Sequence, residues 1–149
     1  MHIDAHLSKI ARLERSRSRL DPSADFELWF WAAMQAGTHA LNAALHHAGL
    51  STESQAFAMQ PGVYLVAQAD GTLVAQLLPP GDVLHLGRPK LEGELPADLK
   101  KIAHAMEIIE SYRDPCVREG KPATPQIAAE CDAALQQCLA LLRHRLEQA

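Results

Sequence analysis

The sequence contains no long apolar run: none of its apolar stretches approaches the roughly 18 residues that a membrane span requires. The first twenty residues, MHIDAHLSKIARLERSRSRL, also lack the apolar core of a secretory signal peptide. These absences argue against a membrane protein and a secreted one. We therefore expect one cytoplasmic domain formed by residues 1–149.

Cysteines are scarce, with three in 149 residues. Cys131 and Cys138 are seven residues apart on a predicted helix, about 10.5 Å along its axis, which exceeds the roughly 7 Å limit for a disulfide. Cys116 falls in a predicted turn and has no obvious partner. We expect the first two to be buried thiols, and the odd number argues against an oxidising compartment.

Motifs of nucleotide-binding and hydrolytic enzymes are missing. There is no Gly-x-x-x-x-Gly-Lys loop, no Gly-x-Gly-x-x-Gly turn and no Gly-x-Ser-x-Gly elbow. Cys116 has no histidine near it in the sequence that could act as its base. We therefore expect no catalytic residue and no cofactor, which favours a protein without enzymatic activity.

The eight histidines lack the spacing of a metal site. His39 and His46 share one face of a predicted helix but lie two turns apart, too far for one zinc ion with ligands at about 2.0–2.1 Å. His46 and His47 point about 100° apart. His2 and His6 are one turn apart and could share an ion, but no third ligand is implied. The sequence therefore predicts no metal.

Charge is distributed unevenly along the chain. The formal net charge is −4, which argues against attraction of the whole protein to nucleic acid. Residues 1–20 nevertheless carry five basic and two acidic side chains, a local charge of +3 that leaves −7 for the rest. A basic helix could contact phosphate, although a solvated surface is the more common role of such a segment.

Four segments have apolar residues at helical spacing. These segments are 3–20, 25–49, 96–113 and 125 onward. The second is apolar over most of its surface, which indicates a central helix or a subunit interface. Gly49 is a natural helix stop, and Thr124 followed by Pro125 is a natural helix start. The order predicts an antiparallel four-helix bundle.

A small β insert is predicted between the second and third helices, over residues 62–87. VYLVAQ and LVAQLL flank Asp70 and Gly71, the signature of a hairpin with a type I′ turn. VLHL, at 83–86, is a candidate third strand. Because so few strands are marginally stable alone in water, we expect the insert to pack on the helices.

One side of the second predicted helix is a candidate subunit interface. It carries two large apolar side chains beside two amides, and a lone domain rarely exposes several large apolar groups together. We therefore expect this side to contact a second subunit or the β insert, and we expect a homodimer. The candidate interface residues are Leu28, Trp31, Gln35 and Asn42.

Candidate binding residues lie near the end of the predicted β insert and on the second helix. His85, in the candidate strand VLHL, and Arg88, two residues after it, could bind an anion, or His85 could simply end the strand. His39 and His46 lie on the same side of the second helix as the interface candidates.

Arg113 and Arg118 complete the candidate binding residues. Arg113 falls on the apolar face at the end of the third predicted helix, where an unpaired charge is costly. We expect it to bond carbonyls of its own turn or of residues 114–121, or to pair with an acid, which could be Glu110, Asp114 or Glu130. The alternative is contact with a ligand or RNA.

Several segments together suggest a family. An aromatic-rich second helix, FELWFWAAMQAGTHALNAAL, is followed by a third ending in Ser-Tyr-Arg, a polar turn, and a Thr-Pro start to the last helix. Residues 25–50 and 96–148 resemble the HEPN-like helical bundle family. The resemblance implies an up-and-down bundle that is often a homodimer. Active members are ribonucleases with Arg, four to six residues, then His; here Arg113 is followed after four residues by Arg118, so the catalytic His has no match.

The leading expectation is therefore a non-enzymatic binding or regulatory module that acts as a homodimer, with RNA or a protein as partner and no membrane. One alternative is an RNA-acting protein or ribonuclease that uses Arg113, Arg118 and a distant histidine. Another is a small-molecule binder with a pocket between the β insert and the bundle.

Overall fold

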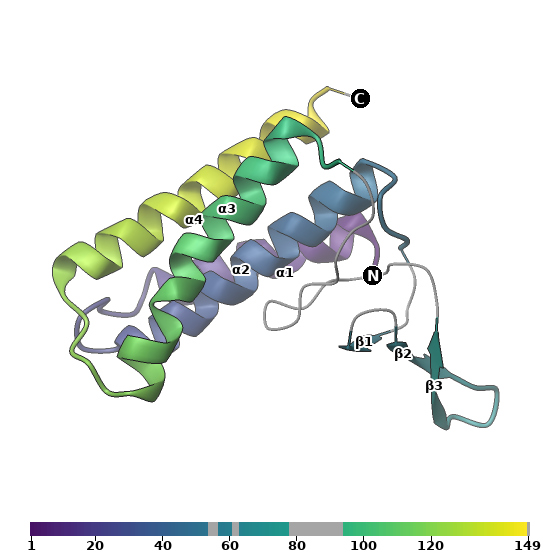
Figure 1. Ribbon diagram of the computed structural model, residues 1–149, viewed down its shortest axis with the longest axis horizontal. Coiled ribbons are helices and arrows are strands. Elements are labelled where there is room, and N and C mark those ends of the chain that lie inside the picture. The colour runs from purple at the N-terminus through teal and green to yellow at the C-terminus, as the bar shows by residue number, and fades with distance from the viewer. Residues whose placement is uncertain (54–56, 61–62, 78–93, 149) are drawn as a thin grey trace.

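The structure is a computed structural model, and it describes residues 1–53, 57–60, 63–77 and 94–148. Four helices pack as a bundle with a small antiparallel sheet inserted between the second and third (Figure 1). The helices are α1 (Ile3–Arg17), α2 (Phe26–His47), α3 (Ala97–Ser111) and α4 (Pro125–Leu146). The predicted fold class is confirmed. No helix in these ranges combines the length and apolar character needed to cross a bilayer.

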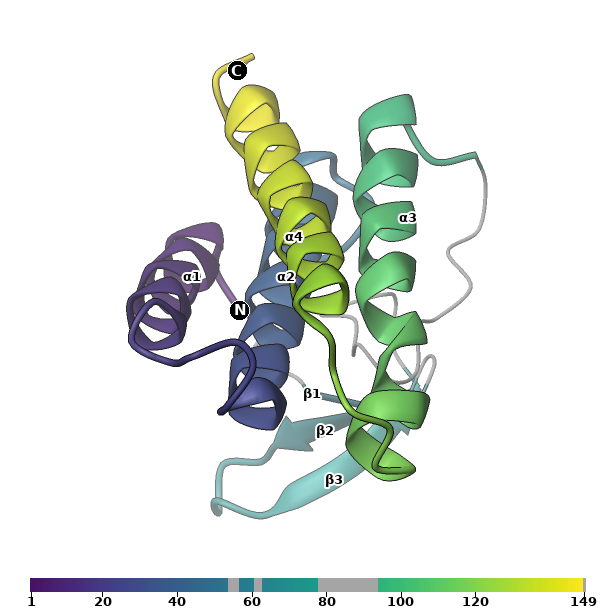
Figure 2. The same ribbon diagram turned by 90° about the vertical axis from the view of Figure 1, so that its left-hand side faces the viewer.

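The central element is α2, which packs against each of the other three helices (Figure 2). This position explains why its apolar residues run almost all the way round the helix. Gly37 has a specific role at the crossing with α3. A Cβ atom at this position would come within 2.0 Å of the Met106 sulfur, so only glycine permits the observed approach.

The helix ends follow the predicted local chemistry. The Thr124 hydroxyl accepts a hydrogen bond from the Ile127 amide (3.2 Å), with Pro125 in the first turn of α4. Gly49 ends α2 with a φ of +69°, the left-handed conformation that glycine adopts easily. The connection after α3 differs from the predicted turn, because residues Arg113–Arg118 form a short π-helix.

The sheet contains β1 (Phe57–Gln60), β2 (Val63–Ala67) and β3 (Leu73–Leu77) in that order. The predicted hairpin is β2–β3, with Val66 opposite Val74. The third strand precedes this hairpin, and the sequence did not predict it. The candidate strand VLHL lies outside the described residues.

The hairpin turn is not the predicted type I′. A type I′ turn needs positive φ at both central residues, but in the described part of the chain only glycines have positive φ. The backbone amide of Gln68 donates a hydrogen bond to the backbone carbonyl of Thr72 (2.8 Å), and Gly71 has a φ of +83°. The loop is therefore three residues long and closes through a left-handed glycine.

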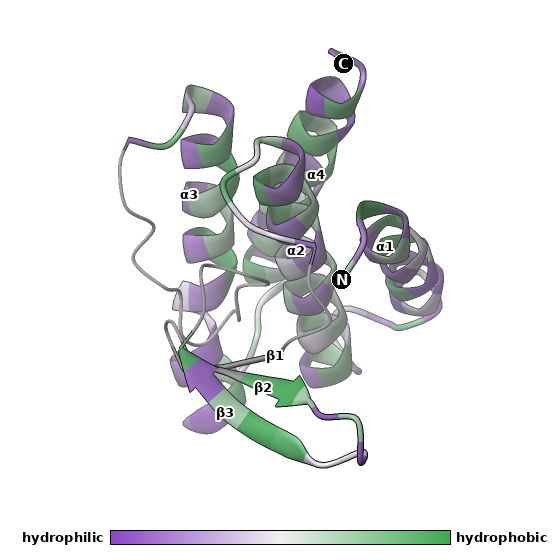
Figure 3. Ribbon diagram, turned by 90° about the vertical axis from the view of Figure 1, so that its right-hand side faces the viewer, coloured by the Kyte–Doolittle hydropathy of each residue, from purple (hydrophilic) through white to green (hydrophobic). Residues whose placement is uncertain are grey.

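The expectation that the insert packs on the helices is wrong for β3. All five of its residues are exposed, with Leu77 at 83%. Figure 3 shows apolar residues on this strand, which lies at one end of the bundle. This strand pairs with β2, and its exposed apolar side chains add little to the core.

Candidate functional site

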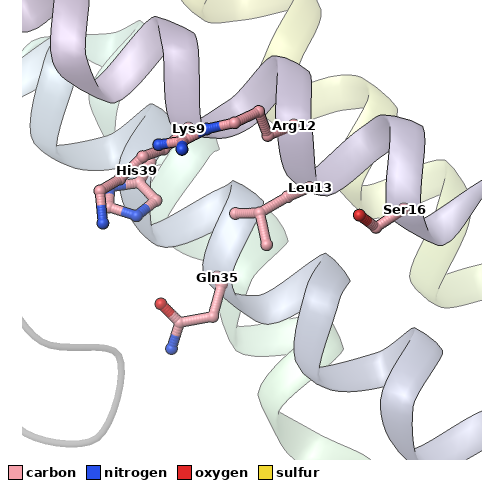
Figure 4. Close-up of a pocket in the computed structure, with 6 residues that line it drawn as sticks. All are labelled: Lys9, Arg12, Leu13, Ser16, Gln35 and His39. Atoms are coloured by element: carbon pink, nitrogen blue, oxygen red, sulfur yellow. The ribbon is translucent and has the colours of Figure 1, made fainter.

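A groove between α1 and α2 is the strongest candidate site. It has a volume of about 290 Å³ and is lined by Lys9, Arg12, Leu13, Ser16, Gln35 and His39. Figure 4 shows Lys9, Arg12 and His39 gathered at one end of it, with Leu13 between them and Ser16. We call this feature the α1–α2 groove.

The groove follows from residue spacing on the two helices. Its four α1 residues are at positions 9, 12, 13 and 16, which lie on one face of a helix. Gln35 and His39 are one turn apart on α2. The next stripe round α1 contains the buried Ile10 and anchors this helix to the core. The apolar contact between α1 and α2 is therefore bordered by polar residues, and the groove lies along this polar border.

The groove is positively charged and its cations are not neutralised. Within the described part of the chain, neither Lys9 nor Arg12 makes an ion pair and no carboxylate lines the groove. Several other arginines are paired. Arg17, the residue after Ser16, binds Glu14 (2.9 Å) and Asp132 (2.6 Å) and lies over the Trp29 ring.

A second cavity, of about 380 Å³, lies beside Arg17, Trp29 and Asp132. Here the cation and the carboxylate satisfy each other, since Arg17 and Asp132 are ion-paired. The side chain of Arg17 also connects α1 to α4. This pairing suits a structural contact, so the second cavity is a weaker candidate for binding a charged ligand.

Three histidines meet at the α1–α2 interface beside the groove. The Nδ1 atoms of His6 and His39 are 2.9 Å apart, and the ring of His46 lies 5.3 Å from that of His6. His6 is fully buried, and His46 is 8% exposed with its Nδ1 atom 2.7 Å from the Ser51 hydroxyl. We call His6, His39 and His46 the histidine group.

Sequence reasoning missed His6 as part of a site. The available signal was its position four residues before Ile10, which puts a polar ring on the inward stripe of α1. His39 and His46 lie two turns apart, as predicted, and His6 lies close to both. Within the described ranges no group of three or more histidines, cysteines or acids is arranged to hold a metal ion.

Glu53 binds the N-terminal end of α1. Its carboxylate accepts hydrogen bonds from the Ile3 amide (2.9 Å) and lies 2.8 Å from His2 Nδ1. The contact with His2, followed by the bond from the Ile3 amide, lowers the pKa of Glu53. This contact ties the chain after α2 to the start of α1, at the end of the histidine group.

Arg113 forms the predicted kind of ion pair, with two of the three acids considered for it. Its guanidinium donates to Glu110 (3.2 Å) and Asp114 (3.0 Å), and Arg118 also binds Asp114 (3.1 Å). The bond from Arg113 is the main cause of a lowered pKa at Asp114. Both arginines are therefore engaged by acids.

Glu130, the third acid considered for Arg113, has other partners. It accepts hydrogen bonds from the Tyr112 hydroxyl and from Gln126. The bond to Glu130 raises the pKa of Tyr112 to about 12. The tyrosine, one residue before Arg113, thus makes the expected connection between the end of α3 and α4.

The side of α2 that the sequence predicts as a subunit interface is largely covered by α1 of the same chain. Asn42 is 2% exposed, which is incompatible with an open surface for a second subunit. Trp31 is partly buried against the core and 5.6 Å from the Phe30 ring, and Gln35 lines the groove. Leu28 remains 65% exposed. Two further candidates, His85 and Arg88, lie outside the described residues.

No protein-family model matches the chain, and neither a curated protein nor a solved structure matches it. The resemblance to HEPN-like bundles therefore stays a prediction.

Proposed function

We propose that this protein is a non-enzymatic binding module that holds a small anionic ligand in the α1–α2 groove. The observation that carries the proposal is the pair of cations, Lys9 and Arg12, at a cavity where no carboxylate is found among the lining residues that the structure describes. Two unpaired cations close together repel each other, and an anion placed between them removes that repulsion.

The remaining lining residues support an oxyanion with a small apolar body. Ser16 and Gln35 add hydrogen-bond donors, and oxygen atoms of a phosphate or carboxylate accept from such groups. Leu13 supplies an apolar surface between them. A volume of about 290 Å³ is near the lower limit for ligand pockets, which favours a compact molecule.

Equilibrium binding tests this proposal directly. Calorimetry at low ionic strength would use sulfate, inorganic phosphate and phenyl phosphate as probes. We expect Lys9→Ala and Arg12→Ala each to weaken binding by about 5- to 30-fold, which corresponds to about 1–2 kcal/mol for a partly screened charge contact. Phenyl phosphate should bind more tightly than inorganic phosphate because its ring can contact Leu13.

Arg15→Ala provides the matched control, since Arg15 is an exposed cation on the same helix outside the groove. It removes the same charge but should leave binding within about twofold. Equal weakening by all three substitutions would indicate attraction to the basic helix as a whole. Such a result would contradict a specific groove.

We also infer a homodimer that uses the exposed Leu28 at the start of α2. This side chain is 65% exposed, unlike the neighbouring aromatic residues, which pack into the core. Light scattering coupled to gel filtration would measure the molar mass. Leu28→Glu should convert dimers to monomers, and a monomeric wild type would contradict the inference.

A further inference from the structure

The second cavity contains a hydrogen-bond donor that no described residue satisfies. Trp29, on the first turn of α2, is 5% exposed and lines this cavity of about 380 Å³. Its indole N–H has no acceptor within the described part of the chain, where the only buried side-chain polar atom left without a partner belongs to His47. The Trp29 N–H is therefore accessible from outside the protein, and the cavity is the open space beside its side chain.

Two neighbouring side chains hold the indole ring of Trp29 in place. The guanidinium of Arg17 lies 5.0 Å from the centre of this ring, and the Phe26 ring stacks with it at a centroid distance of 6.1 Å. The N–H is thus a donor in a fixed position. A ligand that accepts from it does not have to order the side chain first, which lowers the entropy cost of binding.

The charged side chains at the second cavity neutralise each other. Arg17 donates a hydrogen bond to Asp132 (2.6 Å), and these are the two charged residues among the lining that the structure describes. A charged ligand would lose hydration on entering and would find no counter-charge without a partner. The second cavity therefore favours an uncharged ligand, in contrast to the α1–α2 groove.

Asp132 adds an acceptor to the donor of Trp29. Its Oδ1 atom accepts the bond from Arg17, whereas its Oδ2 atom has no partner in the described chain, and the side chain is 46% exposed. A carboxylate can accept several hydrogen bonds, so this one has room for another. Most of the remaining wall is apolar and is formed by Pro22, Pro125, Ala128 and Ala129.

We propose that the second cavity binds a compact, uncharged amide with an apolar body. The amide carbonyl accepts the hydrogen bond from Trp29, and the amide N–H donates to Asp132. The apolar body covers the proline and alanine side chains, and its removal from water stabilises the complex. A volume of about 380 Å³ lies within the range of small-molecule sites. This site is separate from the α1–α2 groove and does not depend on the proposed function.

NMR spectroscopy with acetanilide as the probe tests this site. The protein has two tryptophans, so its ¹H–¹⁵N spectrum contains two indole N–H signals, and Trp31→Phe identifies that of Trp29. We expect acetanilide to shift the Trp29 signal progressively to saturation, because its carbonyl replaces water as the acceptor. The Trp31 signal should stay in place. A Trp29 signal that does not move up to the solubility limit of acetanilide would overturn the proposal.

Two related probes test the chemical class of the ligand. Phenyl acetate keeps the ring and the carbonyl but has no N–H group, so it should bind about tenfold more weakly than acetanilide. Benzoate is of similar size but carries a negative charge, and it should also bind at least about tenfold more weakly. Equal affinity for acetanilide and phenyl acetate would overturn the assignment of an amide. Equal affinity for benzoate would overturn the requirement for an uncharged ligand.

Substitutions in the cavity test its location. Ala129→Phe should abolish acetanilide binding because the new ring occupies the cavity, and the fold should persist because Ala129 is exposed. Trp29→Phe keeps an aromatic ring without the N–H and should weaken binding by about 3- to 10-fold, measured on backbone amide signals of α4. Trp31→Phe is the matched control and should change the affinity by less than about twofold. Unchanged binding by Ala129→Phe would overturn the location.

This inference and the proposed function fail in different ways. Lys9→Ala and Arg12→Ala should leave acetanilide binding unchanged, because both residues line the α1–α2 groove. Sulfate binding without any shift of the Trp29 signal by acetanilide would overturn this inference alone. The Trp29 shift without binding of sulfate, inorganic phosphate or phenyl phosphate would overturn the proposed function alone.

Discussion

The two sides of α2 differ in how they use polar residues. On the side of α3 and α4, large apolar side chains meet, and the nearby arginines have acidic partners, such as Arg145 with Asp98 (2.7 Å). On the side of α1, the interface contains the histidine group and two cations without ion-pair partners in the described chain. Because buried polar rings cost stability unless they are hydrogen-bonded, the histidine group on the α1 side supports the proposal that this side binds a ligand, whereas the other side mainly stabilises the fold.

The largest expected effect is a difference in the free energy of unfolding between substitutions on the two sides of α2. Leu135 on α4 is fully buried, so Leu135→Ala should lower the free energy of unfolding by about 2–5 kcal/mol through lost burial and a cavity. Leu13, at the groove, is only partly buried, and Leu13→Ala should cost about 1 kcal/mol. Urea denaturation of both variants measures the difference. Equal losses would mean that the α1 side is as important to the core as the α4 side.

A smaller effect is expected at the crossing of α2 and α3. In Gly37→Ala the new methyl group meets the buried Met106 side chain, which has to move. Overpacking of this kind typically costs about 1–3 kcal/mol. Thermal unfolding would detect it, and sulfate binding should be unchanged because Gly37 is outside the groove. Ala36→Gly, one residue earlier on α2, controls for the helix propensity of the two residue types.

The ion pair between Asp98 and Arg145 should contribute about 1 kcal/mol, because both side chains are partly exposed. The hydrogen bond from Arg145 is the main cause of a lowered pKa at Asp98. A lowered folded-state pKa stabilises the protein above the unfolded value of about 3.9, and the contribution is lost as the pH falls through the folded value. Asp98→Asn should therefore be less stable than wild type at pH 7 and equally stable near pH 2. A difference that persists at pH 2 would rule out the charge as its origin.

The smallest effects are expected at Arg113. Its partners are on its own helix or in the next residue, and such local pairs contribute about 0.3–0.5 kcal/mol each. Arg113→Leu should thus lower stability by less than about 1 kcal/mol. We also expect no cleavage of structured or single-stranded RNA by the wild type. Cleavage that Arg113→Ala abolishes would contradict this and would direct attention to His39, His47 and His85 as partners.

Prediction from the sequence succeeded where neighbouring residues decide the structure. The apolar periodicity located four helices, Thr124 and Gly49 marked their ends, and Asp70 with Gly71 marked the hairpin. The helix that starts near residue 3 was expected to reach residue 20, but α1 ends at Arg17. Loop geometry was less accessible: the hairpin has a three-residue loop, and the connection after α3 is a π-helix, because small differences in backbone angle distinguish such turns.

The candidate site was only partly accessible to sequence analysis. The local charge of residues 1–20 and the shared face of His39 and His46 were visible, and both bear on the site. The side of α2 that carries Asn42 was nevertheless assigned to a second subunit or the β insert, because periodicity shows which face of a helix is apolar but does not show which element covers that face.

The sequence by itself determined the helices, their order and the basic character of α1, since these depend on residues a few positions apart. Only the tertiary structure decided that α1 covers the side of α2 with His39, which brings together two histidines 33 residues apart. The same packing places Lys9 and Arg12 across a cavity from Gln35. The physical reason is that a helix can bury its apolar stripe against several partners at similar cost. Which helix covers that stripe in the folded chain decides which polar residues face each other at the border of the contact.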